Sequence, residues 1–378
     1  MSDWSLFRSH FPVCRRWAFL DHAAVCPIPD VAVAAMIDYA HRSAENGVAG
    51  WVHWADQIAE CRRLAAQLIN APDSHDICFI PNTTTGIGII AEGFPWQPGD
   101  EVVIAAEEYP SNQYPWLNLA DRGVITRIVP SRGNRIAIED IRNSFTSRTR
   151  LLSISFVEFA SGFRNDLDAL ASLCQANNVF FFVDAIQGLG VLPLDVQRTR
   201  IDALAADGHK WLLGPEGAGI AYIRRDWIDR LRPVLVGAHS TVTPYDYSTI
   251  AFRLKPHAGR YEGGSPNLAG LVALAASLDL LLSVGIEAIA SRVLELTDYF
   301  VDRATREGWK VFSSRDSAEK SGIVSLETGK TDPIVLVRKC RAAGVIVNAR
   351  GGRLRVSPHA YNTEEELDRC LEALSAPD

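Results

Sequence analysis

Three groups of side chains in this sequence could act together on a small molecule. The threonines at 83–85 stand at the expected start of a helix, where hydroxyls and free backbone amides suit a phosphate group. Asp184 ends an apolar run, and a carboxylate buried there requires a cationic partner. Lys210 precedes the apolar residues 211–213, and such surroundings lower the pKa of a lysine and favour Schiff-base chemistry with an aldehyde.

Each group taken alone has an ordinary structural explanation. The threonines could simply cap the helix, the aspartate could form a structural ion pair or cap a turn, and the lysine could lie on the surface. In this order on successive strand ends, however, they supply an anion cradle, an acid for a ring nitrogen and an amine that captures an aldehyde. These are the requirements of pyridoxal phosphate, and the sequence therefore predicts that cofactor.

Six motifs resemble, in order, those of the class V aminotransferase family, a group of fold-type I pyridoxal phosphate enzymes that includes cysteine desulfurases, isopenicillin N epimerase and kynureninase. They are FLDHAA at 19–24, NTTTGI at 82–87, VDAIQ at 183–187, GHKW at 208–211, RYEGGSPN at 260–267 and RVSPHAYNTEEE at 355–366. The resemblance implies an α/β fold, the pyridoxal phosphate-dependent transferase fold of type I. A large cofactor-binding domain, 20–265, would contain a mostly parallel seven-stranded sheet, and 1–19 with 266–378 would form a smaller α+β domain.

The resemblance also implies a role for each residue around the cofactor. Lys210 would form the aldimine with the cofactor and then transfer the proton at Cα. Asp184 would face the pyridine nitrogen, and Gln187 would face the ring hydroxyl. Thr83 and Thr84 would hold the phosphate.

Further roles fall on more distant parts of the chain. His209 would neighbour the phosphate or the lysine, and Arg355 would hold the substrate α-carboxylate through two hydrogen bonds. Ser265 would reach the phosphate of the neighbouring subunit's cofactor, so a homodimer is expected. Tyr109 replaces the histidine that stacks on the cofactor ring in desulfurases. As a catalytic residue it could still stack, but it lacks the imidazole as an acid or base.

Two positions near the cofactor depart from the family pattern. Where the desulfurase branch has an asparagine, the segment FVEFASG offers Glu158 or Phe159, and the sequence leaves both open. Asp207 stands at a usual serine of the phosphate site. Because a carboxylate there would repel the phosphate, its side chain is expected to point elsewhere.

The segment before the carboxylate arginine departs furthest. Desulfurases carry a nucleophilic cysteine there on a mobile loop, whereas this segment, VIVNARGGRLRVS, is short and has no cysteine. Cys340 lies 15 residues before Arg355, but in a helical pattern, and is interpreted as an ordinary helix cysteine. Arg350 and Arg353 could supply a second anion site for an acidic substrate or could be solvated; both alternatives stay open.

The elements that must position these residues alternate along the chain. Apolar strands alternating with helices predict a largely parallel sheet, whose ligands bind at the carboxyl ends of the strands. The expected strands are 78–80, 101–105, 124–129, 151–156, 179–184, 201–206 and 217–223, with a helix at 167–178. The later chain is expected to form helices at 268–284, 286–307 and 333–343, strands near 309–314 and 322–327, and a final helix opening with a capping box of Thr363 and Glu366.

Composition excludes several classes of protein. The 378 residues include 38 Lys and Arg and 45 Asp and Glu, a net charge of −7, which argues against nucleic-acid binding. No apolar stretch resembles a signal peptide or a membrane span. Seven cysteines without a CxxC motif predict reduced thiols in the cytoplasm, and the histidine spacing gives no support for a metal site.

The expected function is that of a pyridoxal phosphate-dependent enzyme acting on an α-amino acid through Lys210, with an aminotransferase of class V placed first. An isopenicillin N epimerase-like epimerase and a cysteine desulfurase-like C–S lyase are the alternatives, because all three reactions begin with the same deprotonation of Cα. A desulfurase acting through Cys340 and a non-catalytic scaffold are further rivals. A scaffold would be expected to have lost Lys210 or Asp184, and both are present.

Overall fold

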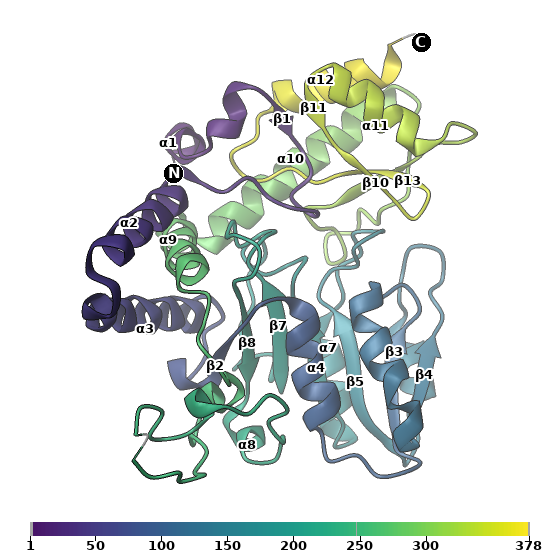
Figure 1. Cartoon of the computed structure of the whole chain (residues 1–378). Helices are drawn as coiled ribbons and strands as arrows, with labels where there is room; N and C mark the ends of the chain where they lie inside the picture. The colour runs from purple at the N-terminus through teal and green to yellow at the C-terminus, as the bar shows by residue number, and fades with distance from the viewer. Residues whose placement is uncertain (1–2, 247, 377–378) are drawn as a thin grey trace.

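A seven-stranded sheet forms the centre of the larger part of the protein in the computed structural model, which describes residues 3–246 and 248–376 (Figure 1). Its strands are β2 (Ile77–Ile80), β3 (Glu101–Ala105), β4 (Ile125–Val129), β5 (Thr149–Ser155), β6 (Phe180–Asp184), β7 (Ala203–Asp207) and β8 (Gly219–Ile223). They lie in the order β2-β8-β7-β6-β5-β3-β4. Strand β8 is antiparallel to both neighbours, and the other neighbouring pairs are parallel. The predicted mostly parallel α/β sheet is confirmed.

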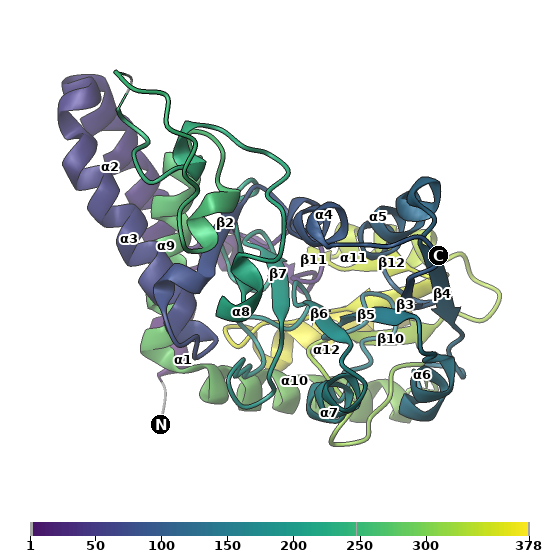
Figure 2. The ribbon, with the colours of Figure 1, turned by 90° about the horizontal axis from the view of Figure 1, so that it is seen from below.

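Helices cover both faces of this sheet, as the view from below shows (Figure 2). The covering helices are α4 (Thr83–Gly93) and α5 (Tyr114–Leu117) on one face and α6 (Ile138–Ser144) and α7 (Leu167–Ala176) on the other. Side chains of β6 alternate between two buried clusters: Phe181 and Val183 join one, and Phe180 and Phe182 join the other. Because both faces are covered, the central strands are apolar at nearly every position.

Three further helices lie beside the β2 edge of the sheet (Figures 1 and 2). They are α2 (Asp30–Asn46), α3 (Trp51–Leu68) and α9 (Leu268–Val284), and a short helix α8 (Arg225–Ile228) follows β8. Helices α2 and α3 were not expected from the sequence. Ala32 is the one fully buried residue of α2, so that helix lacks the apolar stripe by which an amphipathic helix is found in a sequence.

The C-terminal part of the chain forms a second layered unit above the large sheet (Figure 1). Its antiparallel sheet has the order β12-β13-β10-β9. Its strands are β9 (Lys310–Val311), β10 (Val324–Glu327), β12 (Asn348–Arg350) and β13 (Arg353–Val356), and its helices are α10 (Ile286–Arg306), α11 (Pro333–Ala342) and α12 (Glu364–Ser375). Helix α12 opens with the predicted capping box of Thr363 and Glu366.

The N-terminal residues join this second unit. After α1 (Trp4–Ser9), strand β1 (Ala18–Phe19) pairs in parallel with β11 (Val345–Ile346). Helix α10 links the two parts, because Val293 packs in the cluster of the large sheet while Phe300 packs in the cluster of the second unit. The domain boundary near 265 stays a prediction.

Within the described residues, no single helix has the length and apolar character of a membrane span; α9 and α10, bent by 80° at their junction, pass that test only as a pair.

Candidate active site

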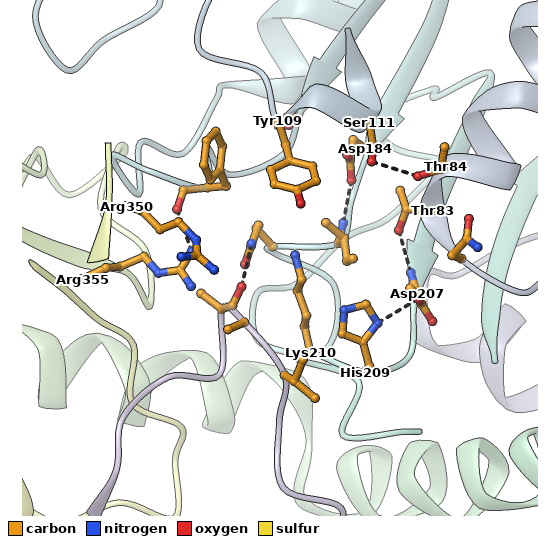
Figure 3. Close-up of a pocket in the computed structure, with 18 residues that line it drawn as sticks. Thr83, Thr84, Tyr109, Ser111, Asp184, Asp207, His209, Lys210, Arg350 and Arg355 are labelled. Atoms are coloured by element: carbon orange, nitrogen blue, oxygen red, sulfur yellow. Dashed lines mark hydrogen bonds and ion pairs between the residues drawn. The ribbon is translucent and has the colours of Figure 1, made fainter. Parts of the chain in front are cut away.

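A cavity of about 320 Å³ lies at the carboxyl ends of β5, β6 and β7 (Figure 3). The ends of these strands and the segments that follow the strands of the large sheet contribute most of its wall. The N-terminal segment contributes the residues at 23–25, and the second unit contributes Arg350 and Arg355. The cavity therefore lies where the two units meet, at the edge of the sheet expected for a ligand.

Lys210 lies on the turn that follows β7, with its amine in the cavity. The turn needs Gly208, because a Cβ there would lie 2.3 Å from the carbonyl oxygen of Ala218. Burial lowers the pKa of Lys210 to about 8, opposed by the negative charge of Asp184 and assisted by the positive charge of Arg355. A lysine with this pKa is partly neutral near neutral pH and can act as a nucleophile.

Asp184 ends β6 and is buried at the cavity wall. Its Oδ1 accepts a hydrogen bond from the backbone amide of Ile186 at 3.1 Å. Burial raises the pKa of Asp184 to about 6, because a carboxylate in this place has lost most of its hydration. A cationic ring nitrogen in the cavity would restore the charged form, so the site fits a protonated pyridine.

Two more carboxyl groups, those of Glu108 and Glu158, lie buried near Asp184. Glu108 was not among the residues predicted from the sequence. Glu108 accepts hydrogen bonds from Ser155, whose amide lies at 2.7 Å and whose hydroxyl lies at 2.5 Å. Burial raises the pKa values of both Glu108 and Glu158; the charge of Asp184 further raises that of Glu108, and the charge of Glu108 further raises that of Glu158. Both favour the neutral form. Asp184 is the one of the three that lines the cavity, so it is the carboxyl that can meet a cation there. Glu108 stands in the EYPSN segment beside Tyr109, which was the available signal.

The start of α4 forms the opposite end of the cavity. Asn82 caps this helix by accepting a hydrogen bond from the amide of Thr85. Thr83 accepts a hydrogen bond from the amide of Asp207 at 3.0 Å, and Thr84 donates one to Ser111 at 2.8 Å. Together with free amides of the first turn, these groups fit a phosphate.

Asp207 lies at this same end of the cavity, and the expectation that its side chain points away from a bound phosphate stays a prediction. Its Oδ2 lies 2.8 Å from Nδ1 of His209, and its Oδ1 accepts a hydrogen bond from the amide of Gly208 at 2.7 Å (Figure 3). The carboxylate is thus occupied by its own neighbours, and His209 stands between it and the cavity.

Gln187 is held in one orientation by two hydrogen bonds. Its side-chain nitrogen donates to the carbonyl oxygen of Ala23, and its side-chain oxygen accepts from the indole of Trp211, both at 3.0 Å. The amide nitrogen carries a second hydrogen, which suits the oxygen of a ring hydroxyl.

Tyr109 and Phe159 form an aromatic corner of the cavity. Their rings meet edge to face with centroids 5.2 Å apart, and the amine of Lys210 lies 5.7 Å from the centroid of Tyr109. Phe159 lines the cavity, whereas Glu158 is buried behind it and accepts a hydrogen bond from Asn165. Of the two residues left open by the sequence, Phe159 is therefore the one at the site.

Arg355 is almost completely buried, with 1% of its side chain exposed. It donates to Oδ1 of Asp21 at 3.1 Å and to the carbonyl oxygen of Phe159 at 2.9 Å. Arg350 lies beside it at the cavity (Figure 3). Arg353 lies outside, with its guanidinium 3.3 Å from the ring centroid of Phe312, so the three arginines separate into two at the site and one away from it.

Asp21 and Asn348 are the residues of this arginine cluster that the sequence analysis did not single out. Asp21 stands in the FLDHAA motif, which was a usable signal. The sequence held no signal for Asn348 beyond its position two residues before Arg350.

None of the seven cysteines lines the cavity. Cys340 is buried in α11 within the core of the second unit, which agrees with its interpretation as a helix cysteine. Ser265 lies in a separate groove with Thr85 and Gly263. Its predicted contact with a neighbouring subunit stays a prediction, as do the roles assigned to the other site residues.

Comparison with known families gives a match along nearly the whole chain. The family model described as Aminotransferase class-V matches residues 18–370. A probable cysteine desulfurase of Methanothermobacter thermautotrophicus is 29% identical over 97% of this chain and 96% of its own length. The cysteine desulfurase CsdA of Escherichia coli is also 29% identical, over 97% and 96% of the two chains.

Solved structures share the same fold. The structure of Escherichia coli CsdA superposes with a TM-score of 0.90 at 25% identity over 99% of this chain and 98% of its own. The cystine C–S lyase C-DES superposes with a TM-score of 0.91 at 24% identity over 97% and 99% of the two chains. One C-DES structure holds glycine covalently linked to its pyridoxal phosphate cofactor.

Proposed function

The chain belongs to the class V aminotransferase family, and from that premise we propose that it transfers the amino group of an α-amino acid. Its cofactor is pyridoxal phosphate. When bound, this cofactor supplies an electron sink for the negative charge that develops at Cα. The remaining work falls to side chains of the cavity.

The observation that supports this proposal is the convergence of Lys210, Asp184 and Arg355 on one cavity. Lys210, with its pKa lowered to about 8, can take a proton from Cα and return it. Asp184 would hold the proton of the ring nitrogen. The Nε atom of Arg355 is buried and has no hydrogen-bond partner among the described residues, so it can donate to the substrate α-carboxylate.

Tyr109 would stack on the cofactor ring, and Gln187, His209, Thr83 and Thr84 would hold its hydroxyl and phosphate. Both threonines lie at the start of α4 and line the cavity, so each offers its hydroxyl to the phosphate. Since these contacts fix the ring against the sheet, they would leave the substrate side of the cavity to the arginines and the aromatic corner.

A β-eliminating C–S lyase is the second candidate, because the relatives carry the names of cysteine desulfurases and one solved structure that of a cystine C–S lyase. Transfer of sulfur through a protein persulfide is disfavoured, since no cysteine lines the cavity. An epimerase of the isopenicillin N epimerase kind stays the third alternative. It would need an acid on the face opposite Lys210, where Tyr109 is the available group.

The reactions are separated by following absorbance and products while the holoprotein is titrated with a panel of amino acids. Transamination converts the bound cofactor to its amine form and releases a keto acid. Elimination restores the starting spectrum and releases pyruvate with a sulfur product, and epimerisation restores it with inverted substrate. If no amino acid changed the spectrum or gave a product, the proposal would be wrong.

We also propose a homodimer in the cytoplasm, with Ser265 near the partner's phosphate. Support for the dimer comes from the groove around Ser265, which is walled by the half-exposed side chains of Val234, Leu235 and Val236. The seven unpaired cysteines agree with a reducing compartment. Light scattering gives the oligomeric state, and a weaker cofactor affinity in Ser265→Ala would support its reach across the interface.

A further inference from the structure

We propose that the substrate is an acidic α-amino acid whose side-chain carboxylate binds Arg350, while Arg355 binds the α-carboxylate. This inference rests on the proposed function and names its substrate class. It starts from the hairpin of β12 and β13, whose short turn stands where the sequence analysis noted a shorter segment than in desulfurases.

The hairpin holds Arg350 in a fixed place. Gly351 and Gly352 form its two-residue turn, with φ of 55° and 72°, values that suit the tight turn of a β-hairpin and favour glycine. Arg350 pairs with Arg353 across the turn, and Asn348 pairs with Arg355. Directly opposed residues, and residues two apart on one strand, point to the same face, so all four side chains share one face of the hairpin.

This placement concentrates positive charge at a local cost. Like charges directly opposite each other destabilise a pair of strands, and Arg350 faces Arg353. Arg353 reduces the conflict by turning onto the ring of Phe312. Arg350 instead turns to the cavity, where its charge lowers the pKa of Lys210.

The charge of Arg355 is already balanced within the chain, whereas that of Arg350 is not. Asp21 accepts from Arg355 through Oδ1 and from Asn348 through Oδ2 at 2.8 Å. Asn348 in turn accepts from Arg350 at 3.0 Å. Arg350 has this amide oxygen and the carbonyl oxygen of Ala349 as partners, and it forms no ion pair with any residue of 3–246 or 248–376.

The two guanidinium groups are therefore linked by hydrogen bonds through Asp21 and Asn348, but only Arg350 lacks a carboxylate that balances its charge. Arg355 is buried and fixed, which suits the α-carboxylate that every substrate has in the same place. Arg350 is half-exposed at the cavity wall and carries an uncompensated positive charge, which suits a group that distinguishes one substrate from another. The side-chain carboxylate of an acidic substrate would accept charge-assisted hydrogen bonds from the guanidinium group of Arg350.

The test compares isosteric pairs of amino acids, L-aspartate with L-asparagine and L-glutamate with L-glutamine, on the holoprotein. Dissociation constants come from the change in cofactor absorbance, measured before any turnover, so the readout is binding. For the better acid, we expect roughly 10–100-fold tighter binding than for its amide, the worth of a charge-assisted hydrogen bond. In Arg350→Gln the ratio should fall to about one, because binding of the acid, which loses its charged partner, weakens more than binding of the amide.

Arg353→Gln is the matched control, because it removes the neighbouring arginine outside the cavity and should leave the ratio intact. Arg350→Lys keeps the charge and should restore part of the preference, which shows that lost charge rather than a damaged hairpin is responsible. Equal binding of acids and amides by the unaltered protein would overturn the inference, and so would an equal loss for both in Arg350→Gln. Amino acids that bind without this preference leave the proposed function standing, whereas a spectrum that none of them changes overturns both.

Discussion

At the proposed cofactor end of the cavity, Asp184 ends β6 and Lys210 follows the adjacent strand β7, whereas at the proposed substrate end Arg350 and Arg355 come from the hairpin of a different sheet. The first pair stands at the carboxyl ends of strands that are buried on both faces. The second stands on a hairpin with a two-glycine turn. Groups that must serve every reaction of the family are thus built on the rigid core, and a group that could select a substrate is built on a short peripheral element, where change is tolerated best.

Removing the amine at the rigid end should have the largest effect. In Lys210→Ala we expect turnover to fall roughly 10²–10⁴-fold, the usual contribution of a positioned acid–base group. Steady-state kinetics measure the loss, and reduction with borohydride followed by mass spectrometry of the unaltered protein and the variant shows which lysine, if any, carries the cofactor. Retained turnover with a different labelled lysine would contradict the assignment.

Replacing the carboxylate proposed to meet the ring nitrogen should have the next largest effect. Asp184→Asn keeps the size of the side chain but removes its charge, so we expect roughly 100-fold weaker cofactor binding or turnover, in line with the cost of breaking a buried ion pair. Equilibrium dialysis gives the affinity, with the unaltered protein as reference. An unchanged affinity together with an unchanged rate would mean that Asp184 does not face the ring.

The pH dependence of cofactor loading connects the two ends. The amine attacks the aldehyde in its neutral form, and the pKa of Lys210 is lowered to about 8. The rate at which cofactor-free protein takes up pyridoxal phosphate should therefore rise about tenfold per pH unit below that value and level off above it.

Because the positive charge of Arg350 lowers this pKa, the midpoint in Arg350→Gln should move to higher pH. Stopped-flow absorbance across a pH series measures both midpoints. A midpoint that stayed in place, or moved to lower pH, would show that the two ends are not electrostatically coupled.

The smallest effect expected is at the turn of the hairpin. Gly352 has φ of 72° and open space where a Cβ would stand, so Gly352→Ala should cost about 1 kcal/mol of unfolding free energy through its backbone alone. Gly88→Ala in α4 is the matched control, since Gly88 also has open space but an ordinary helical backbone, and alanine there should be neutral or stabilising. Urea unfolding measures the free energy of unfolding of both variants. An equal loss in both would show that the positive φ of Gly352 does not require glycine.

The sequence was sufficient for the rigid end because its signals are local. Asp184 and Lys210 each lie in a short contiguous motif after an apolar strand, and the parallel sheet brings such strand ends to one edge. Local motifs did not decide between Glu158 and Phe159. Phe159 and Glu158 differ by one position, which in an irregular segment decides whether a side chain enters the cavity or lies behind it.

Asp207 shows the same limit from another side. The sequence indicates a carboxylate beside a phosphate site, and repulsion suggested that it would turn away. In the structure its Oδ2 lies 2.8 Å from Nδ1 of His209, and a pairing between side chains two positions apart depends on the exact path of the turn.

What the sequence determined by itself is the sheet, the cofactor and the residues that follow its central strands, because hydrophobic periodicity and contiguous motifs are properties of short stretches of chain. What only the tertiary structure decided is the substrate end. Asp21 and Arg355 are 334 positions apart, and Asn348 joins them to Arg350 by hydrogen bonds that no motif contains. Which charges remain uncompensated depends on contacts between distant segments, and such contacts exist only when the two units have packed around the cavity.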